Sequence, residues 1–172
     1  MNQVLFPSLA SVLAGIEPID PRHSAEARLR LDSLTKPIGS LGRLEDIAAQ
    51  MYAIFSGHIP LPLRRAVYVF AADHGVTAEG VSAYPREVTA QMVHNFVAGG
   101  AAINVLARLH DVQLTVVDVG VDADFEPAPG LCSMKVRRGS GNMLREPALT
   151  QEDLNAAIEA GMSLAQAASE QG

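Results

Sequence analysis

Two short apolar runs constrain the fold of this chain more than any other feature of its sequence. Residues 66–72 (AVYVFAA) and 114–119 (LTVVDV) are almost continuously apolar and rich in β-branched side chains. Runs of this length and composition are typical of strands that are buried on both faces of a sheet. Because helical segments separate the two runs, they predict a parallel β-α-β arrangement with a right-handed crossover.

The stretch between the two runs predicts two helices. Residues 87–97 repeat apolar side chains at helical spacing, and we expect Val88, Met92 and Phe96 to point inward. A shorter helix over residues 101–109 then leads into the second strand.

After residue 124 the pattern weakens. Residues 133–136 predict a short strand, and a last helix begins near Thr150, where Asp153 replaces the usual Glu or Gln of a capping box. This helix is expected to continue to Gly172, where a parallel fold would next place a strand, so the sequence looks cut short.

Residues 1–60 predict an N-terminal helical segment that precedes an α/β portion at 61–172. Asp20 and Pro21 are suited to begin one helix, and a second helix is expected to start near residues 40–43 and to stop at Gly57. We expect the apolar stripe of the second helix to pack inward. The stripe consists of Leu44, Ile47, Ala48, Met51, Ile54 and Phe55.

Composition excludes several classes of protein. Thirteen Lys and Arg against nineteen Asp and Glu give a net charge of −6, which disfavours nucleic acid or an anionic membrane as partner. Hydrophobic residues make up 48% of the chain, enough for a folded core. The single cysteine, Cys132, excludes an intrachain disulfide and fits a reducing compartment. With no apolar run near ~18 residues and no basic region before the N-terminal apolar stretch, we expect a cytoplasmic protein.

Polar side chains follow both predicted strands. Asp73 and His74 come directly after the first strand, and Asp118 and Asp122 lie at the end of the second. Ligands of open parallel sheets bind beyond the carboxyl ends of the strands, where acids and a histidine can orient a hydroxyl, hold a metal or move a proton. The alternative, which the residues leave open, is that Asp73 caps a loop and His74 makes a structural hydrogen bond.

The sequence patterns that would indicate a metal site or a phosphate site are weaker than those at the strand ends. None of the five histidines forms an i, i+4 pair or a His-x-His motif, so we expect neither a metal site nor a cofactor. The glycine loop 139–142, after Arg137 and Arg138, could bind a phosphate or could be a simple turn. The same two interpretations apply to residues 36–43.

Four segments, in their order and spacing, resemble the N-terminal half of the nicotinate-nucleotide–dimethylbenzimidazole phosphoribosyltransferase family. They are LTKPIGSLGRLE (34–45), FAADHGVTAEGVSAYPREVTAQMV (70–93), VVDVGVDAD (116–124) and VRRGSGNM (136–143). The resemblance implies an α/β fold: an incomplete parallel sheet with flanking helices, a Rossmann-like half, plus the N-terminal helices of a small helical subdomain. It also implies a homodimer.

The implied reaction moves phosphoribose from nicotinate mononucleotide to dimethylbenzimidazole, giving α-ribazole phosphate and nicotinate in cobalamin lower-ligand assembly. The benzimidazole must lose its N–H proton, which suits a carboxylate base. Family members are about twice as long, and their glutamate base and main phosphate loop belong to the other half. We therefore assign no catalytic residue and expect this pentosyltransferase fragment to be inactive alone.

The resemblance also implies binding residues. Residues 82–92 match the part of the family that walls the benzimidazole pocket, with an apolar slot and an amide, and the segment after the first strand would lie at the rim. The alternative function is a non-catalytic small-molecule-binding or assembly module of the same fold. The expected binding residues are Asp73, His74, Gly75, Tyr84, Pro85, Gln91 and Met92.

Overall fold

The computed structural model describes residues 9–170, and the chain divides into two compact units. We refer to Ala10–Leu63 as the helical unit and to the described residues from Arg64 onward as the α/β unit. The first eight residues of the predicted 1–60 segment and the last two of the predicted final helix lie outside the described residues. Within residues 9–170, no helix combines the length and apolar character that a membrane-spanning segment requires.

The α/β unit is built on an open, three-stranded parallel sheet with flanking helices, which confirms the predicted fold class. Both apolar runs form strands, and a third, short strand pairs with the second, so the order is β1-β2-β3. The strands are β1 (Ala66–Ala72), β2 (Gln113–Gly120) and β3 (Leu131–Ser133).

The third strand lies earlier than residues 133–136, so that prediction is wrong in position. Leu131 and Cys132 pair with Val116 and Val117, the most buried part of β2, and their apolar side chains suit that place. Met134 and Val136 each donate one backbone hydrogen bond to β2 beyond this strand, and Lys135 between them forms an ion pair with Asp118.

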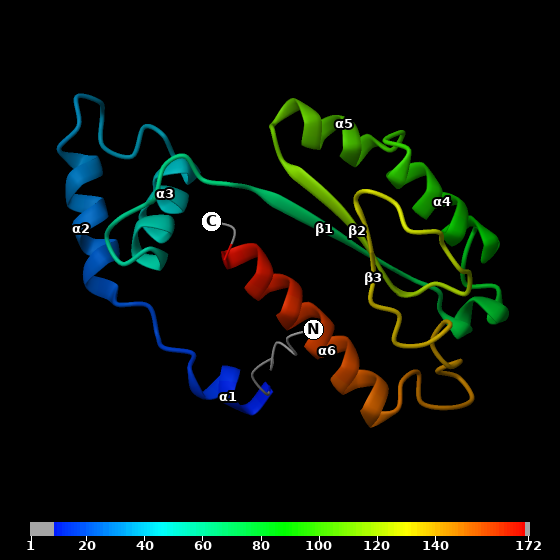
Figure 1. The fold of residues 1–172 in the computed structure, drawn as a ribbon. Coiled ribbons are helices and arrows are strands. Elements are labelled where there is room, and N and C mark those ends of the chain that lie inside the picture. Colours follow the sequence, from blue (N-terminus) through cyan, green and yellow to red (C-terminus); the bar gives the residue numbers. More distant parts are fainter. Residues whose placement is uncertain (1–8, 171–172) are drawn as a thin grey trace. The chain divides into compact units, whose positions relative to one another are not determined.

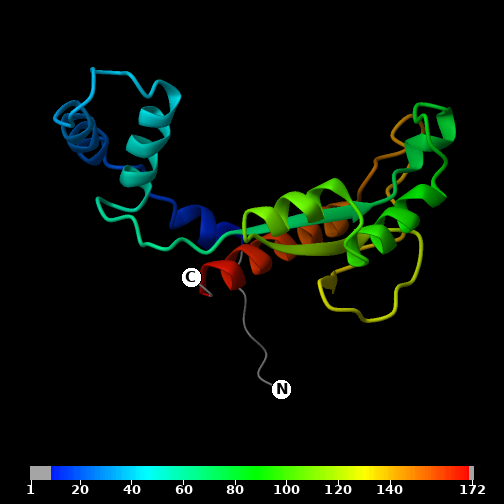
Figure 2. The same cartoon turned by 90° about the horizontal axis from the view of Figure 1, so that it is seen from above.

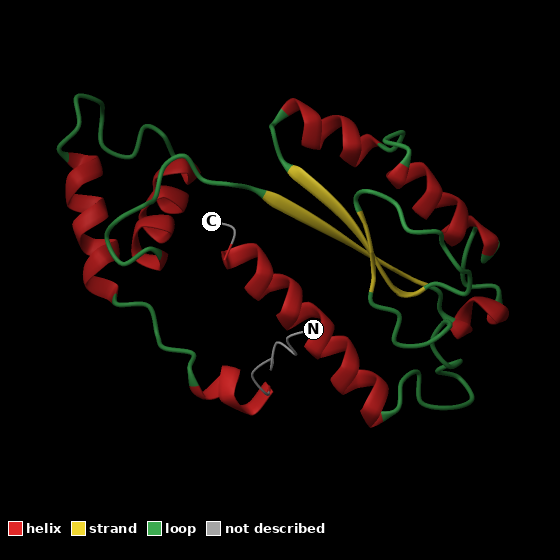
Figure 3. Ribbon diagram, viewed as in Figure 1, coloured by secondary structure: helices red, strands yellow, loops and turns green. Residues whose placement is uncertain are grey.

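Helices flank the sheet on both sides. In Figures 1 and 3, α4 and α5 follow one face and α6 lies along the other. The predicted Thr150 cap of α6 is confirmed, because the Asp153 N–H donates to Thr150 Oγ1 and the Thr150 N–H donates to Asp153 Oδ2. The helices of the α/β unit are α4 (Glu87–Val97), α5 (Ala102–Leu109) and α6 (Gln151–Glu170), and the 3₁₀ helix η1 (Gly75–Glu79) precedes α4.

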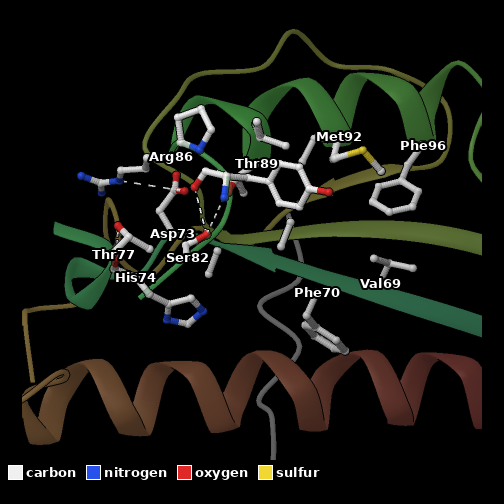
Figure 4. Close-up of a pocket in the computed structure, with 16 residues that line it drawn as sticks. Val69, Phe70, Asp73, His74, Thr77, Ser82, Arg86, Thr89, Met92 and Phe96 are labelled. Atoms are coloured by element: carbon white, nitrogen blue, oxygen red, sulfur yellow. Dashed lines mark hydrogen bonds and ion pairs between the residues drawn. The ribbon is translucent and has the colours of Figure 1, made fainter. Parts of the chain in front are cut away.

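Burial differs between the two long strands. In β2, Val116 and Val117 are almost completely buried, as its apolar run predicts. In β1, however, Phe70 is 51% exposed, which contradicts the prediction of burial on both faces. β1 is an edge strand of the described sheet, and the Phe70 side chain points away from α4 (Figure 4).

Helix α4 buries a slightly different face from the predicted one. Val93 is 1% exposed and forms the core with Val116 and Val121, whereas Met92 is 37% exposed. Phe96 packs against this core as predicted. The buried stripe is therefore centred one residue later than Met92, which leaves Met92 free to face a cavity.

The helical unit contains α1 (Leu9–Ala14) except for its first residue, together with α2 (Pro21–Asp32) and α3 (Arg43–Ile54). Helices α2 and α3 lie side by side (Figure 2). The predicted boundaries are confirmed where they can be checked. The Asp20 carboxylate accepts a hydrogen bond from the Arg22 N–H at the start of α2. Beyond α3, Gly57, with φ +89°, donates to the Tyr52 carbonyl and reverses the chain.

The buried face of α3 is not the predicted apolar stripe. Leu44 and Ile47 are 63% and 47% exposed, whereas Ala49 and Ala53 are almost completely buried. Small side chains let two helices approach closely, and a helix presents the same face every three to four residues. Glu45 lies on this buried face as well. Its carboxylate accepts hydrogen bonds from Lys36 Nζ at 2.7 Å and from the Leu41 N–H at 3.1 Å.

Candidate functional site

The candidate site is a cavity of about 410 Å³ between the carboxyl half of β1 and helix α4, shown in Figure 4. Its lining comes from β1 and the residues just after it, from the loop that follows η1, and from α4. Parallel α/β sheets bind ligands at this position, beyond the carboxyl end of a strand. We call it the β1–α4 cavity.

A buried carboxylate marks one end of the β1–α4 cavity. Asp73 is 4% exposed, and its Oδ2 accepts a 2.7 Å hydrogen bond from the Asp122 N–H at the end of β2. Its Oδ1 lies 3.9 Å from Nε of Arg86. A buried carboxylate requires such partners to remain charged, so the ends of β1 and β2 hold Asp73 in place.

Arg86 joins three parts of this end. It precedes α4, and its Nη2 lies 3.3 Å from Asp122 Oδ2, so the guanidinium links the helix start to the ends of both long strands. Gly139 lies directly beside it: a Cβ at that position would collide with Nη2 of Arg86, and the φ of +69° already favours glycine. Gly139 therefore has a steric role that does not depend on a bound phosphate.

The glycine loop 139–142 lies against the segment that follows β1. Ser140 donates its N–H to the Asp73 carbonyl and accepts from the Gly75 N–H. A Cβ on Gly75 would lie 2.6 Å from the Ser140 carbonyl oxygen, so only glycine permits this approach. Arg137 and Arg138 are engaged by Asp153 and Asp124, and the Arg138 guanidinium lowers the pKa of Asp124. These pairs favour the turn interpretation of the loop.

The acids at the end of β2 have structural partners. Asp118 Oδ2 lies 2.6 Å from Lys135 Nζ, while its Oδ1 accepts hydrogen bonds from the Gly120 and Val121 N–H groups. Lys135 also donates to the carbonyls of residues 121 and 123. Asp118 thus fixes the turn that carries Asp122.

Five of the seven predicted binding residues line the β1–α4 cavity: Asp73, His74, Tyr84, Pro85 and Met92. The His74 side chain extends to the side of β1 opposite Met92 and Phe96 (Figure 4).

The other two lie elsewhere. Gly75 packs under the 139–142 loop, and Gln91 is on the exposed side of α4; neither is among the lining residues.

Several lining residues were not predicted. Thr89, Val93 and Phe96 continue the face of α4 that Met92 begins, and Val69 faces them from β1. Helical periodicity combined with the carboxyl-end rule could have found the helical ones. Arg86 carries no such signal, because its role depends on loops that only the fold brings together.

A family model described as phosphoribosyltransferase matches residues 16–172. The chain belongs to this family. It is 54% identical over 164 residues to a nicotinate-nucleotide–dimethylbenzimidazole phosphoribosyltransferase of Geobacter sulfurreducens, covering 95% of this chain and 47% of the relative. A similarly named protein of Geobacter metallireducens is 52% identical over 157 residues, covering 91% of this chain and 44% of the relative.

Solved structures of the phosphoribosyltransferase family agree with this assignment. The crystal structure of the similarly named protein from Thermus thermophilus superimposes with a TM-score of 0.83 at 50% identity, covering 89% of this chain and 46% of that structure. The chain spans about half the length of the curated relatives that it matches.

Proposed function

We propose that this chain forms the benzimidazole-binding part of an enzyme that transfers phosphoribose from nicotinate mononucleotide to dimethylbenzimidazole. The observation that carries the proposal is the β1–α4 cavity: an apolar slot with a buried carboxylate at its end, in a chain of this phosphoribosyltransferase family. Its volume of about 410 Å³ is within the usual range for small-molecule sites.

In this proposal, Tyr84, Pro85 and Met92 contact the flat faces and edge of the ring system. Asp73 supplies a polar contact at the strand end, whereas the His74 side chain points to the other side of β1 (Figure 4). Gly75 acts indirectly by allowing the 139–142 loop to pack beside Asp73. Gln91, which the sequence suggested as an amide contact, is not among the proposed ring contacts because it does not line the cavity.

Asp73 is proposed as an anchor for the ring, not as the base that removes its proton. Its two carboxylate oxygens already have partners, because Oδ2 accepts from the Asp122 N–H at 2.7 Å and Oδ1 lies 3.9 Å from Arg86 Nε. We propose that the base and the phosphate contacts come from residues that correspond to the other half of the relatives.

A second copy of the chain is proposed as a further partner. Large apolar side chains of the helical unit are exposed, including Leu29 at 73% and Leu44 at 63%, and β1 has a free edge within the described sheet. Both features favour self-association. Light scattering should give a dimer at tens of micromolar protein (a rough range), and a monomer at that concentration would count against it.

The binding proposal can be tested by following the fluorescence of dimethylbenzimidazole as the chain is added. We expect a dissociation constant on the order of millimolar, weakened about tenfold by Asp73→Asn, because a hydrogen bond to a charged acceptor is lost. Asp111→Asn, an exposed site outside the cavity, is the matched control and should bind as the wild type does. Equal binding by all three proteins would place the ring elsewhere.

Turnover provides a second test. Nicotinate release by this chain should be at least about 100-fold slower than by a full-length relative, since positioned acid–base and electrostatic groups each contribute about that much. Release within tenfold of the relative would show that this half contains a complete catalytic site.

A further inference from the structure

A second cavity of the α/β unit lies on the α6 side of the sheet and has a volume of about 270 Å³. Its lining comes from the ends of β1 and β2, from the loop over residues 136–149 and from α6. We call it the loop–α6 cavity. Its apolar lining residues include Val119, Val136, Met143, Ala148, Leu149 and Ala157.

Backbone hydrogen bonds hold the walls of the loop–α6 cavity. The Val136 N–H donates to the Val119 carbonyl at 3.0 Å, which ties the loop to β2. The Gly141 N–H donates to the Ala148 carbonyl at 2.8 Å, so the loop is also closed on itself. An apolar cavity whose walls cannot collapse costs free energy when it is empty, and a ligand that fits it recovers part of that cost.

The charged groups around the loop–α6 cavity already have partners. Arg137 Nη1 lies 3.0 Å from Asp153 Oδ2 at the start of α6. The Asp73 carboxylate accepts the hydrogen bond from the Asp122 N–H described above. A charged ligand would therefore leave water for an apolar space without gaining a counter-ion, which is unfavourable. The cavity favours a neutral ligand.

His74 brings an imidazole to the loop–α6 cavity. Its side chain lies on the side of β1 opposite Met92 and Phe96 (Figure 4), and α6 follows that side of the sheet (Figure 3). Within residues 9–170 this imidazole makes no capping bond to η1, so it can bond to a ligand. A neutral imidazole has one donor and one acceptor nitrogen, and a hydroxyl group can bond to either.

We infer that the loop–α6 cavity is a second small-molecule site, which takes a neutral molecule with one aromatic ring and one hydroxyl group. The ring lies against Val136, Leu149 and Ala157, and the hydroxyl bonds to His74. A cavity of ~150 Å³ is already large enough for benzene. The loop–α6 cavity is larger than that but below the usual range for drug-sized ligands, so it suits a single ring with a short substituent. This site is on the opposite face of β1 from the β1–α4 cavity and does not depend on the function proposed for that cavity.

The site can be tested by NMR titration of the isotopically labelled chain with benzyl alcohol. We expect a dissociation constant on the order of millimolar, with amide shifts at Ala148 and Ala157 and NOEs from the ring protons to the Met143 methyl group. Shifts at Val69 and Phe96, with Ala148 and Ala157 unmoved, would place the ring in the β1–α4 cavity and overturn the inference. An absence of binding would overturn it as well.

Two analogues test the chemistry of the ligand. Benzoate has a similar size but carries a charge, so it should bind at least about tenfold more weakly than benzyl alcohol. Toluene lacks the hydroxyl, so its affinity should not depend on the imidazole. His74→Leu should therefore weaken benzyl alcohol about fivefold and leave toluene no weaker, because only the alcohol loses a hydrogen bond. Equal losses for both compounds, or benzoate bound as tightly as the alcohol, would overturn the inference.

Variants that fill the cavity test its position. Ala157→Leu, on α6, should weaken benzyl alcohol at least about tenfold, because the added methyl groups take the space of the ring. Ala148→Leu fills the cavity from the loop and keeps the test valid if one variant folds poorly. Ala165→Leu makes the same change at an exposed position of α6 and should bind as the wild type does. Wild-type affinity in both filling variants would overturn the inference.

Discussion

The two units of the chain each contain a buried lysine–carboxylate pair, but the surroundings of the two pairs differ. In the α/β unit, Lys135 and Asp118 are 2.6 Å apart beside the almost completely buried Val116, Val117 and Val121. In the helical unit, Lys36 and Glu45 are 2.7 Å apart. The fully buried apolar residues of the helical unit are alanines, and its large apolar side chains are mainly exposed.

The difference shows two ways of burying charge. Asp118 has two backbone N–H donors besides its lysine, so it organises the turn after β2 within a valine core. Glu45 has one, the Leu41 N–H, and fixes the connection between α2 and α3. The α/β unit therefore depends on volume filled by branched side chains, and the helical unit depends on close approach of small ones.

Lys135→Met should give the largest loss of stability. It leaves the Asp118 carboxylate buried without its cation, which typically costs about 3–5 kcal/mol of unfolding free energy. Urea unfolding followed by far-UV circular dichroism measures this loss. Arg145→Met, which breaks a mainly exposed pair with Glu79, is the control and should cost far less. Equal losses in the two variants would mean that the Asp118 pair does not organise the core.

Ala49→Leu should come next, with its effect confined to the helical unit. Ala49 is 2% exposed on the face of α3 that packs in this unit, and extra methyl groups in such a place cost about 1–3 kcal/mol. Ile47→Ala, two residues earlier and 47% exposed, should change stability by less than about 0.5 kcal/mol. Amide exchange resolves the two units, and a larger loss for Ile47→Ala would restore the apolar stripe as the packed face.

A smaller effect is expected from the protonation of Glu45. Lys36 and the Leu41 N–H lower its pKa from the ordinary value of 4.5. A carboxylate whose pKa is lower in the folded than in the unfolded state stabilises the folded state at pH values above its unfolded-state pKa. This stabilisation is lost as the pH falls through the folded-state pKa.

Thermal unfolding of the helical unit should therefore be followed by NMR between about pH 3 and pH 6. Its unfolding temperature should fall as the pH is lowered, and Glu45→Gln should reduce the slope of this pH dependence. Glu152→Gln, at the exposed start of α6, should leave that slope unchanged. An unaltered slope in Glu45→Gln would show that other carboxylates, such as Asp46 beside Arg28, account for it.

The sequence predicted the positions of the strands better than it predicted which face of a strand or helix is buried. Continuous β-branched runs identified β1 and β2 because few other structures accommodate them, and capping residues located the start of α2 and of α6. Periodicity failed for α3 because Ala49 and Ala53 carry little hydrophobic signal, yet their small size decides how close the helices lie. The exposure of Phe70 could not be predicted, because the residues of β1 alone do not determine how many strands lie beside it.

The candidate site was predictable in part. The carboxyl-end rule and the family resemblance both pointed to Asp73 and Met92, which do line the cavity. The position of Arg86 between Asp73 and Asp122 was not predictable, because contacts between residues far apart in sequence depend on how three loops meet.

The most direct test of the account uses a second comparison between the units. The α/β unit has the β1–α4 cavity, and the helical unit has a cavity of about 440 Å³ lined by residues that include Glu26, Ala48 and Tyr52. Volume alone does not distinguish the two, so amide shifts of the isotopically labelled chain should be recorded during a titration with dimethylbenzimidazole. The account predicts shifts at Val69, Thr89 and Met92, with Ala48 and Tyr52 unmoved; shifts at Ala48 and Tyr52 with an unchanged β1–α4 cavity would contradict it.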